Sequence, residues 1–259
     1  MKYRGDIPKS LLLGSTVLVA LFLYIPIIIL IVYSFNSNAF TYDWQGFTFS
    51  WYHQLFASSE VWSALNNSLT VALSSVFLSL SMGALLMFWG SNRLIKNSMT
   101  LFYGSLAIPE IIIAVGLLTL FFMFKIPLGF GTLVVGHTLI GLGYVIPILY
   151  ARHKDLDPVL IEASYDLGAS RLQTFFFVAL PSLLPALISA GLLVFIVSFD
   201  DFVFSFFCAE ASVGTLPVYI YSLIQSGATP IINALSVLML TVSSLVVIGI
   251  SVLQIYPKR

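Results

Sequence analysis

The sequence predicts an all-α polytopic membrane protein with six transmembrane helices and both termini on the cytoplasmic side. Three observations lead to this class. Apolar residues make up 59% of the 259 residues and charged residues only 8%, against about 45–50% and about 25% in soluble domains. The mean hydropathy is +1.02. The apolar residues form long runs, and almost all Lys and Arg residues lie outside those runs on one predicted side.

Six apolar runs reach the length of about 20 residues that a helix needs to cross a bilayer core of about 30 Å. They cover residues 10–35, 65–90, 98–124, 130–150, 182–208 and 231–256. The first run follows three basic residues, as in a signal peptide, but it exceeds the about 7–15 apolar residues of such a segment. We therefore expect it to remain as a membrane helix.

The orientation follows from the basic residues, because Lys and Arg near membrane helices favour cytoplasmic loops. With six spans, ten of the eleven basic residues fall on one side and only Lys125 falls on the other. The ten are Lys2, Arg4, Lys9, Arg93, Lys96, Arg152, Lys154, Arg171, Lys258 and Arg259. This partition predicts that both termini are cytoplasmic.

Composition and spacing exclude several other classes of function. The formal net charge is zero, which indicates no nucleic-acid partner. The single cysteine, Cys208, excludes an internal disulfide and a multi-cysteine metal site. The three histidines, His53, His137 and His153, are far apart in the predicted topology, so we expect no metal site. No nucleophile and base have the spacing of a catalytic pair, so we expect no catalytic residues.

The cytoplasmic segment between the fourth and fifth spans, residues 154–181, has the pattern of two short helices. Asp157 and Pro158 predict a helix start, with Asp as the N-cap and Pro at the first helical position. Gly168 predicts the end of this helix, because glycine readily adopts the positive φ of a helix C-terminus.

A second helix is expected immediately after that turn. Ser170 and Gln173 predict a capping box at its start. Pro181 and Pro185 are expected to break the chain as it re-enters the membrane. The whole segment fits two interpretations, an amphipathic elbow that lies on the membrane surface or a docking element for a cytoplasmic partner.

This segment also carries a motif of a known family, the EAA signature of ABC-importer permeases. That signature reads E-A-A, three residues, G, nine residues and I-x-L-P. The chain is similar at every fixed position, with Glu162, Ala163, Ser164, Gly168, Val178, Leu180 and Pro181. Ser164 replaces an Ala and Val178 replaces an Ile, and the spacing agrees throughout.

The resemblance implies a type I ABC-importer membrane subunit over essentially the whole chain. Residues 1–64 would form an N-terminal transmembrane helix and outer loop, and residues 65–256 the permease transmembrane domain. In this family the segment from Glu162 to Gly168 is a coupling helix that sits in a groove of the ATP-binding subunit. The small residues Ala163 and Ser164 would let that partner approach closely. The chain has no P-loop sequence, so a separate ATPase would bind ATP and this chain would need no cofactor.

Three acidic residues lie within the predicted spans, where charged groups are costly and indicate function. Glu110 is expected near the middle of the third span, and Asp200 and Asp201 near the outer end of the fifth. No Lys or Arg within the spans is available to neutralise them, so a cationic substrate would explain all three. Alternatively, Glu110 is a helix-packing residue and the two aspartates form a solvated helix end.

Two further features refine this hypothesis of a substrate path. Consecutive helical positions point about 100° apart, so we expect only one of Asp200 and Asp201 to face the path. Tyr221 near the outer face is expected to add a cation–π contact, although an aromatic ring there also fits an interfacial belt.

Several segments are similar to the permeases of spermidine/putrescine importers within this family. They are residues 24–37, 44–47, 198–202, 216–222 and 230–235. The resemblance implies polyamine uptake across a bacterial cytoplasmic (inner) membrane, with a PotB-like sister permease, a PotA-like ATPase dimer and a PotD-like substrate-binding protein. Other members move ferric iron, thiamine or other small solutes, so those substrates stay open. A secondary carrier would leave the EAA spacing unexplained, and a purely structural subunit would tolerate amide substitution of the acids.

Overall fold

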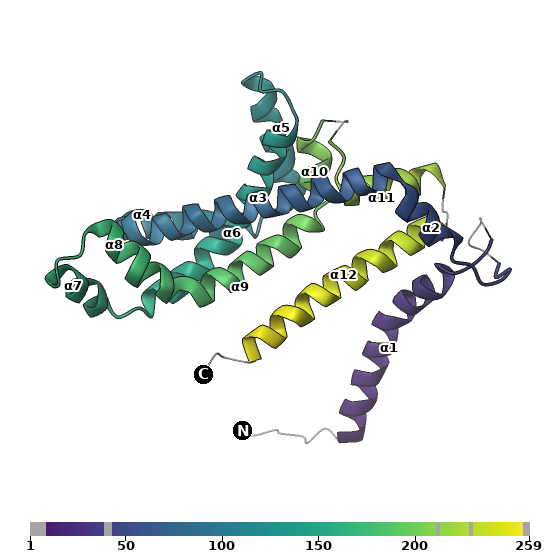
Figure 1. Cartoon of the computed structure of the whole chain (residues 1–259), viewed down its shortest axis with the longest axis horizontal. Coiled ribbons are helices and arrows are strands. Elements are labelled where there is room, and N and C mark those ends of the chain that lie inside the picture. The colour runs from purple at the N-terminus through teal and green to yellow at the C-terminus, as the bar shows by residue number, and fades with distance from the viewer. Residues whose placement is uncertain (1–8, 39–42, 211–212, 228–229, 256–259) are drawn as a thin grey trace, which may run out of the picture. The chain divides into compact units, whose positions relative to one another are not determined.

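The computed structural model describes residues 9–38, 43–210, 213–227 and 230–255 (Figure 1). Within these ranges the chain is helical apart from turns, short loops and one isolated antiparallel bridge between Asn36 and Phe47. The chain divides into two compact units, one formed by Met1–Ser59 with Ile220–Arg259 and the other by Glu60–Tyr219. Each unit is described by itself.

The first unit holds α1 (Lys9–Tyr33), α2 (Ser50–Ala57) and α12 (Pro230–Ile255), and α12 packs against both other helices. The described part of the loop between α1 and α2 is organised by Asn36, which is fully buried. The Asn36 side chain donates to the Asp43 carbonyl at 2.9 Å and accepts the Gln45 N–H at 3.0 Å. The Asn36 carbonyl accepts the Trp51 indole N–H at 2.7 Å. These bonds give the loop a defined shape without regular secondary structure.

The second unit contains the remaining elements. They are α3 (Ser59–Trp89), α4 (Asn92–Ser105), α5 (Glu110–Met123), α6 (Phe130–Lys154), α7 (Pro158–Asp166), α8 (Arg171–Thr174), a π-helical turn (Phe175–Ala179), α9 (Leu180–Phe199), α10 (Val203–Cys208) and α11 (Leu216–Ser226), whose last residues belong to the first unit. The central helix of this unit is α6, which packs against α4, α5, α9 and α10 (Figure 1).

The core of the second unit lies where α3, α6 and α9 meet. Val145 and Leu149 of α6 are fully buried there. Two glycines let the helices approach closely. A Cβ atom on Gly83 of α3 would lie 2.5 Å from Val145 Cγ1, and one on Gly141 of α6 would lie 3.0 Å from Val194 Cγ1 of α9. Small residues at helix crossings are typical of membrane bundles, where close packing replaces the hydrophobic effect as the main attraction between helices.

The structure confirms the all-α class and a set of apolar spans. Four helical segments are long and apolar enough to cross a membrane, namely Leu11–Tyr33, Ser59–Trp89, Phe130–Lys154 and Arg171–Phe199, and a fifth is obtained if α4 and α5 form one bent span. The unbroken stretch of α12 whose side chains are described, Pro230–Leu245, is too short for the same criterion. The sixth span, the orientation and the division at residue 64 stay predictions.

The third predicted span is not one straight helix. α4 ends at Ser105, α5 begins at Glu110, and the two helices are bent by 111°. Pro109 explains the break, because proline has no N–H to donate and disfavours a helical conformation at the residue before it. Glu110 therefore occupies the first position of a new helix inside the predicted third span.

The fifth predicted span differs at both ends. The helix begins at Arg171 and continues through Pro181 and Pro185, so the breaks expected at these prolines are wrong. Pro181 is the second residue after the π-helical turn, and the wider turn before it leaves room for a proline ring that a regular α-helix would exclude. Pro185 sits in the apolar part of α9, where membrane helices tolerate proline.

At its other end this helix stops short of the predicted boundary. α9 ends at Phe199 and α10 begins at Val203. Asp200 and Asp201 therefore lie in a helix break, and the argument from consecutive helical positions does not apply to them. The break still gives the two side chains different surroundings, as described below.

Candidate functional site

The elbow, defined here as residues 154–181, has the local structure that its sequence predicts. The Asp157 carboxylate caps α7 by accepting the Val159 N–H at 3.0 Å. Gly168 has a φ of +84° at the end of this helix. The Ala169 N–H bonds to the Ser164 carbonyl at 3.0 Å and the Gly168 N–H to the Tyr165 carbonyl at 2.9 Å, which is the Schellman arrangement of a glycine-terminated helix.

The capping box of the second helix is also confirmed. Ser170 Oγ accepts the Gln173 N–H at 3.3 Å, and Gln173 Oε1 accepts the Ser170 N–H at 2.8 Å. The two short helices are thus closed at their adjoining ends by residues a few positions apart. Their relative position follows from the turn at Gly168 between them.

The residues of the EAA-like motif do not all face outward. Glu162, Ala163 and Gly168 are exposed, whereas Ser164 is buried. The Ser164 hydroxyl lies 2.9 Å from Thr174 Oγ1 and donates to the Ile161 carbonyl at 2.7 Å. Ser164 therefore holds α7 against α8 and does not lie on the open surface that the sequence predicted for it.

The last two motif residues lie at the start of α9. Leu180 is half-buried and Pro181 is exposed. They join the elbow to the long apolar helix.

The tip of the elbow exposes apolar side chains. Leu167 is 89% exposed and Phe177 is 79% exposed. Both line a shallow hollow of about 340 Å³ whose other walls are Gly168, Ala169, Gln173, Thr174 and Val178. Exposed apolar groups beside a hollow are typical of a surface that meets a partner.

The base of the elbow is attached firmly to the helical core. Phe175 is buried, and its ring lies 5.2 Å from that of Phe88 and 4.7 Å from that of Trp89 at the end of α3. The Arg152 side chain at the end of α6 donates to the Ser182 carbonyl of α9 at 3.2 Å. A force on the elbow would therefore be transmitted to α3, α6 and α9.

The three acidic residues predicted to line a path are placed at two helix breaks of the second unit. Glu110 is exposed at the first position of α5, and Asp200 is exposed at the end of α9. Asp201 is buried, with 8% exposure. α5 packs against α10 (Figure 1), and Glu110 lies near enough to Asp201 for the two carboxylates to repel each other. The three acids thus lie at two helix breaks of one unit, and two of them, Glu110 and Asp200, are exposed.

A cavity of about 230 Å³ lies beside Glu110. Its walls include the aromatic side chains Phe102, Tyr144 and Phe204, together with Ser105 and several aliphatic residues. Glu110 is the charged residue in this lining. A carboxylate with aromatic faces nearby has the chemistry to hold an alkylammonium group, because the carboxylate attracts the charge and the rings add cation–π attraction.

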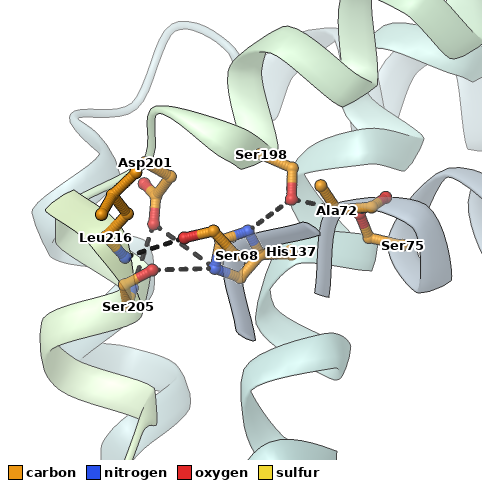
Figure 2. Close-up of polar contacts among 8 residues, drawn as sticks. All are labelled: Ser68, Ala72, Ser75, His137, Ser198, Asp201, Ser205 and Leu216. Atoms are coloured by element: carbon orange, nitrogen blue, oxygen red, sulfur yellow. Dashed lines mark hydrogen bonds and ion pairs between the residues drawn. The ribbon is translucent and has the colours of Figure 1, made fainter. Parts of the chain in front are cut away.

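Asp201 faces a buried polar network centred on His137 of α6, which is 1% exposed (Figure 2). His137 Nδ1 lies 2.7 Å from Ser198 Oγ, and Nε2 lies 3.2 Å from Ser205 Oγ and 3.5 Å from Asp201 Oδ2. The same Asp201 oxygen accepts the Ser205 N–H at 3.0 Å. Ser75 of α3 donates to Ser198 Oγ at 3.2 Å, so the network joins α3, α6, α9 and α10.

This network is the part of the site that sequence reasoning missed. From the sequence, His137 is considered only as a possible metal ligand, and one of Asp200 and Asp201 is expected to face the path, with no partner named for the other. The available signal was the position of His137 itself, because an ionisable residue inside an apolar run marks a functional or paired group. Its partners could not be named, since they lie on other helices.

Tyr221 lies on α11, where its hydroxyl accepts a hydrogen bond from the Gln225 side chain at 2.9 Å. It belongs to the first compact unit, whereas Glu110, Asp200 and Asp201 belong to the second. Its contribution to a path stays a prediction.

Comparison with known proteins gives the family. Residues 75–257 match the model of the binding-protein-dependent transport system inner membrane component. The chain is 36% identical over 230 residues to the spermidine/putrescine transport system permease protein PotC of Haemophilus influenzae, covering 88% of this chain and 90% of that protein. It is 33% identical over 240 residues to the putrescine transport system permease protein PotI of Escherichia coli, covering 89% and 84%.

A solved structure agrees at the level of the fold. A chain of a bacterial ABC transporter involved in the import of the acidic polysaccharide alginate superposes with a TM-score of 0.72, at 18% identity, over 97% of this chain and 96% of that one. The elbow, the apolar helices and these similarities lead to one assignment. The chain belongs to the family of binding-protein-dependent transport system inner membrane components, the membrane permeases of ABC importers.

Proposed function

We propose that this chain is a membrane permease subunit of an ATP-driven importer that moves polyamines, spermidine or putrescine, into the cytoplasm. The observation that carries the proposal is the pair of open carboxylates, Asp200 and Glu110, at two helix breaks that lie within predicted apolar spans. No Lys or Arg lies within the predicted spans to neutralise them. The similarity to PotC and PotI supports the same substrate class.

The proposed path uses the acids in order from the outer side. Asp200, at the end of α9, would meet an ammonium group first, and Glu110 would receive it in the aromatic cavity of Phe102, Tyr144 and Phe204. A charge inside a membrane is costly unless it is paired, so an entering cation and a waiting carboxylate each lower the cost of the other. Tyr221 would add a cation–π contact nearer the outer face.

The proposed coupling uses the elbow. The exposed residues Glu162, Ala163 and Gly168, with the apolar tip of Leu167 and Phe177, would dock into a groove of a separate ATPase. Because Phe175 and Arg152 attach the elbow to the core, ATP-driven movement of that partner would move α3, α6 and α9. ATP would be bound and hydrolysed by the partner, with no cofactor and no catalytic residue in this chain.

The full assembly would contain a PotB-like sister permease, a PotA-like ATPase dimer and a PotD-like substrate-binding protein in a bacterial inner membrane. This chain would contribute six spans with both termini inside, its N-terminal helix and outer loop in residues 1–64 and its permease domain in residues 65–256. The family description, which names a binding protein, supports the extracytoplasmic partner.

The test is uptake of radiolabelled spermidine and putrescine by cells that lack their own polyamine importers and express the complete transporter. We expect wild type to restore uptake and Asp200→Asn to lower it strongly, with Glu110→Gln also impaired. The matched control is Asp43→Asn, the same change at an exposed aspartate in the loop between α1 and α2. Uptake by wild type together with a fully active Asp200→Asn variant would remove the path. No uptake by an assembled wild-type complex would redirect the substrate search to ferric iron, thiamine or other small solutes.

A further inference from the structure

Two carboxylates that are neighbours in the sequence have opposite surroundings at the break after α9. Asp201 is buried and faces His137, whereas Asp200 is exposed. We infer that His137 is a positioning residue for transport, which holds this break so that Asp201 faces inward and Asp200 faces the path. The inference rests on the proposed function, in which Asp200 meets the substrate.

The imidazole ring bridges the two sides of the break. Its Nδ1 atom bonds to Ser198 Oγ at 2.7 Å, in the last turn of α9. Its Nε2 atom lies 3.2 Å from Ser205 Oγ, in the first turn of α10, and 3.5 Å from the Asp201 carboxylate between the helices. Figure 2 shows the ring between these groups. One side chain of α6 thus fixes the distance and angle between two helix ends.

The groups around the ring connect it to both sides of the break. Ser75 Oγ lies 2.9 Å from the Ala72 carbonyl and 3.2 Å from Ser198 Oγ, and Ser198 Oγ faces His137 Nδ1. The Nε2 atom faces Ser205 Oγ and the Asp201 carboxylate. Because both ring nitrogens form polar contacts, one imidazole serves the end of α9 and the start of α10 at the same time, and Asp201 lies toward the ring.

The rest of α10 is held to α6 by contacts that do not involve His137. Thr132 Oγ1 donates to the Cys208 carbonyl at the end of α10 at 2.8 Å. Gly136 gives space to Phe204, since a Cβ atom there would lie 3.0 Å from the Phe204 ring. Removal of the imidazole should therefore leave α10 in place and free only the break before it.

The position of this network makes the imidazole hard to replace. His137, Ser198 and Ser205 are all buried, and groups inside a membrane domain have no bulk water to serve as a substitute partner. An apolar ring at this position would leave the two hydroxyls and the Asp201 carboxylate to find new partners. The break would then adopt other conformations, and the orientation of Asp200 would vary.

The experiment measures the KM and maximal rate of spermidine uptake by the complete transporter. We expect His137→Phe to raise KM about tenfold with little change in maximal rate. A tenfold weaker binding corresponds to the free-energy cost of leaving one buried polar group without its partner. His137→Gln, whose amide reaches the Nε2 position, should recover more than His137→Asn, whose amide reaches the Nδ1 position. His53→Phe on α2, where the histidine is exposed, is the matched control and should leave KM unchanged.

A double-mutant cycle tests whether His137 acts through Asp201. Asp201→Asn and His137→Phe should each raise KM, and the double variant should be no worse than the more impaired single variant. The cycle with His53→Phe in place of His137→Phe should show no coupling. Effects of His137→Phe and Asp201→Asn that multiply would overturn the inference, as would an unchanged KM in His137→Phe.

Assembly of the complex, measured by immunoblot and size-exclusion chromatography, separates positioning from folding. If His137→Phe does not assemble, the same cycle is run with His137→Gln and His137→Asn. Loss of assembled complex in proportion to activity in all three variants would show a purely structural role and overturn the inference. If Asp200→Asn takes up spermidine like wild type while His137 and Asp201 stay coupled in the cycle, the proposed path through Asp200 is wrong.

Discussion

The caps of the elbow and the network around His137 are both closed by hydrogen bonds, but these bonds join residues at very different separations. The cap of α7 joins residues two positions apart, and the capping box of α8 joins residues three positions apart. The bonds of His137 to Ser198 and Ser205 join residues 61 and 68 positions apart, and Ser75 bonds to Ser198 across 123 positions. The elbow can therefore form its caps from its own residues, whereas the network exists only when four helices are packed.

A glycine of the elbow and a glycine of the helical core also differ in whether they depend on near neighbours or on other helices. Gly168 in the elbow has a φ of +84° and open space around it. Gly83 in the core has no space on the side that faces Val145 and Leu149. Substitution of the first glycine would strain the backbone alone, and substitution of the second would force two helices apart.

The largest effect is expected from Gly83→Ala. The added Cβ would lie 2.5 Å from Val145 Cγ1 and 3.0 Å from Leu149 Cδ1, and overpacking of this kind costs about 1–3 kcal/mol. Thermal unfolding of the purified transporter should show the loss. Gly104→Ala on α4, where a Cβ meets nothing within 4 Å, should be neutral or slightly stabilising. A Gly83→Ala protein as stable as wild type would contradict the close crossing of α3 and α6.

The next effect is expected from Gly168→Val, which should impair uptake while leaving the thermal unfolding of the helical core unchanged. A side chain in the left-handed region costs about 1–2 kcal/mol, so the elbow would favour another conformation. Gly168→Asn should keep most of the activity, because asparagine tolerates positive φ better than valine does. Uptake and ATP hydrolysis by the complete transporter measure both variants. Equal activity of the Val and Asn variants would show that φ at this position is not what matters.

The smallest effect is expected from Asp157→Ala, which removes the cap on the Val159 N–H. Loss of a helix N-cap costs about 1 kcal/mol, so the first turn of α7 should open more often. Hydrogen exchange at the Val159 and Leu160 amides should become faster, with the rest of the protein unaffected. Asp157→Asn retains an acceptor oxygen and should resemble wild type. Unchanged exchange in the alanine variant would mean that partners elsewhere hold this helix end.

Sequence rules worked best where structure depends on near neighbours or on bulk hydrophobicity. Asp157, Gly168 and the Ser170–Gln173 pair were interpreted correctly, because caps and left-handed turns are decided within a few residues. The apolar runs located the long helices for a similar reason, since transfer of a helix into lipid depends on its own side chains.

The same rules failed where the conformation of a residue depends on the surrounding helix or on a contact with another helix. Pro109 did break the third span, but Pro181 and Pro185 did not break the fifth, because a π-helical turn and the surrounding apolar helix accommodate them. Ser164 fitted the family motif as a small surface residue, yet Thr174 covers its hydroxyl.

The sequence by itself determined that this protein is a helical membrane permease with an elbow of defined turns, since hydropathy, caps and motif spacing are properties of short segments. Only the tertiary structure decided that Asp201 turns inward to His137 while Asp200 stays open. A buried carboxylate takes the direction in which partners stabilise it, and here those partners come from separate helices that no local pattern connects.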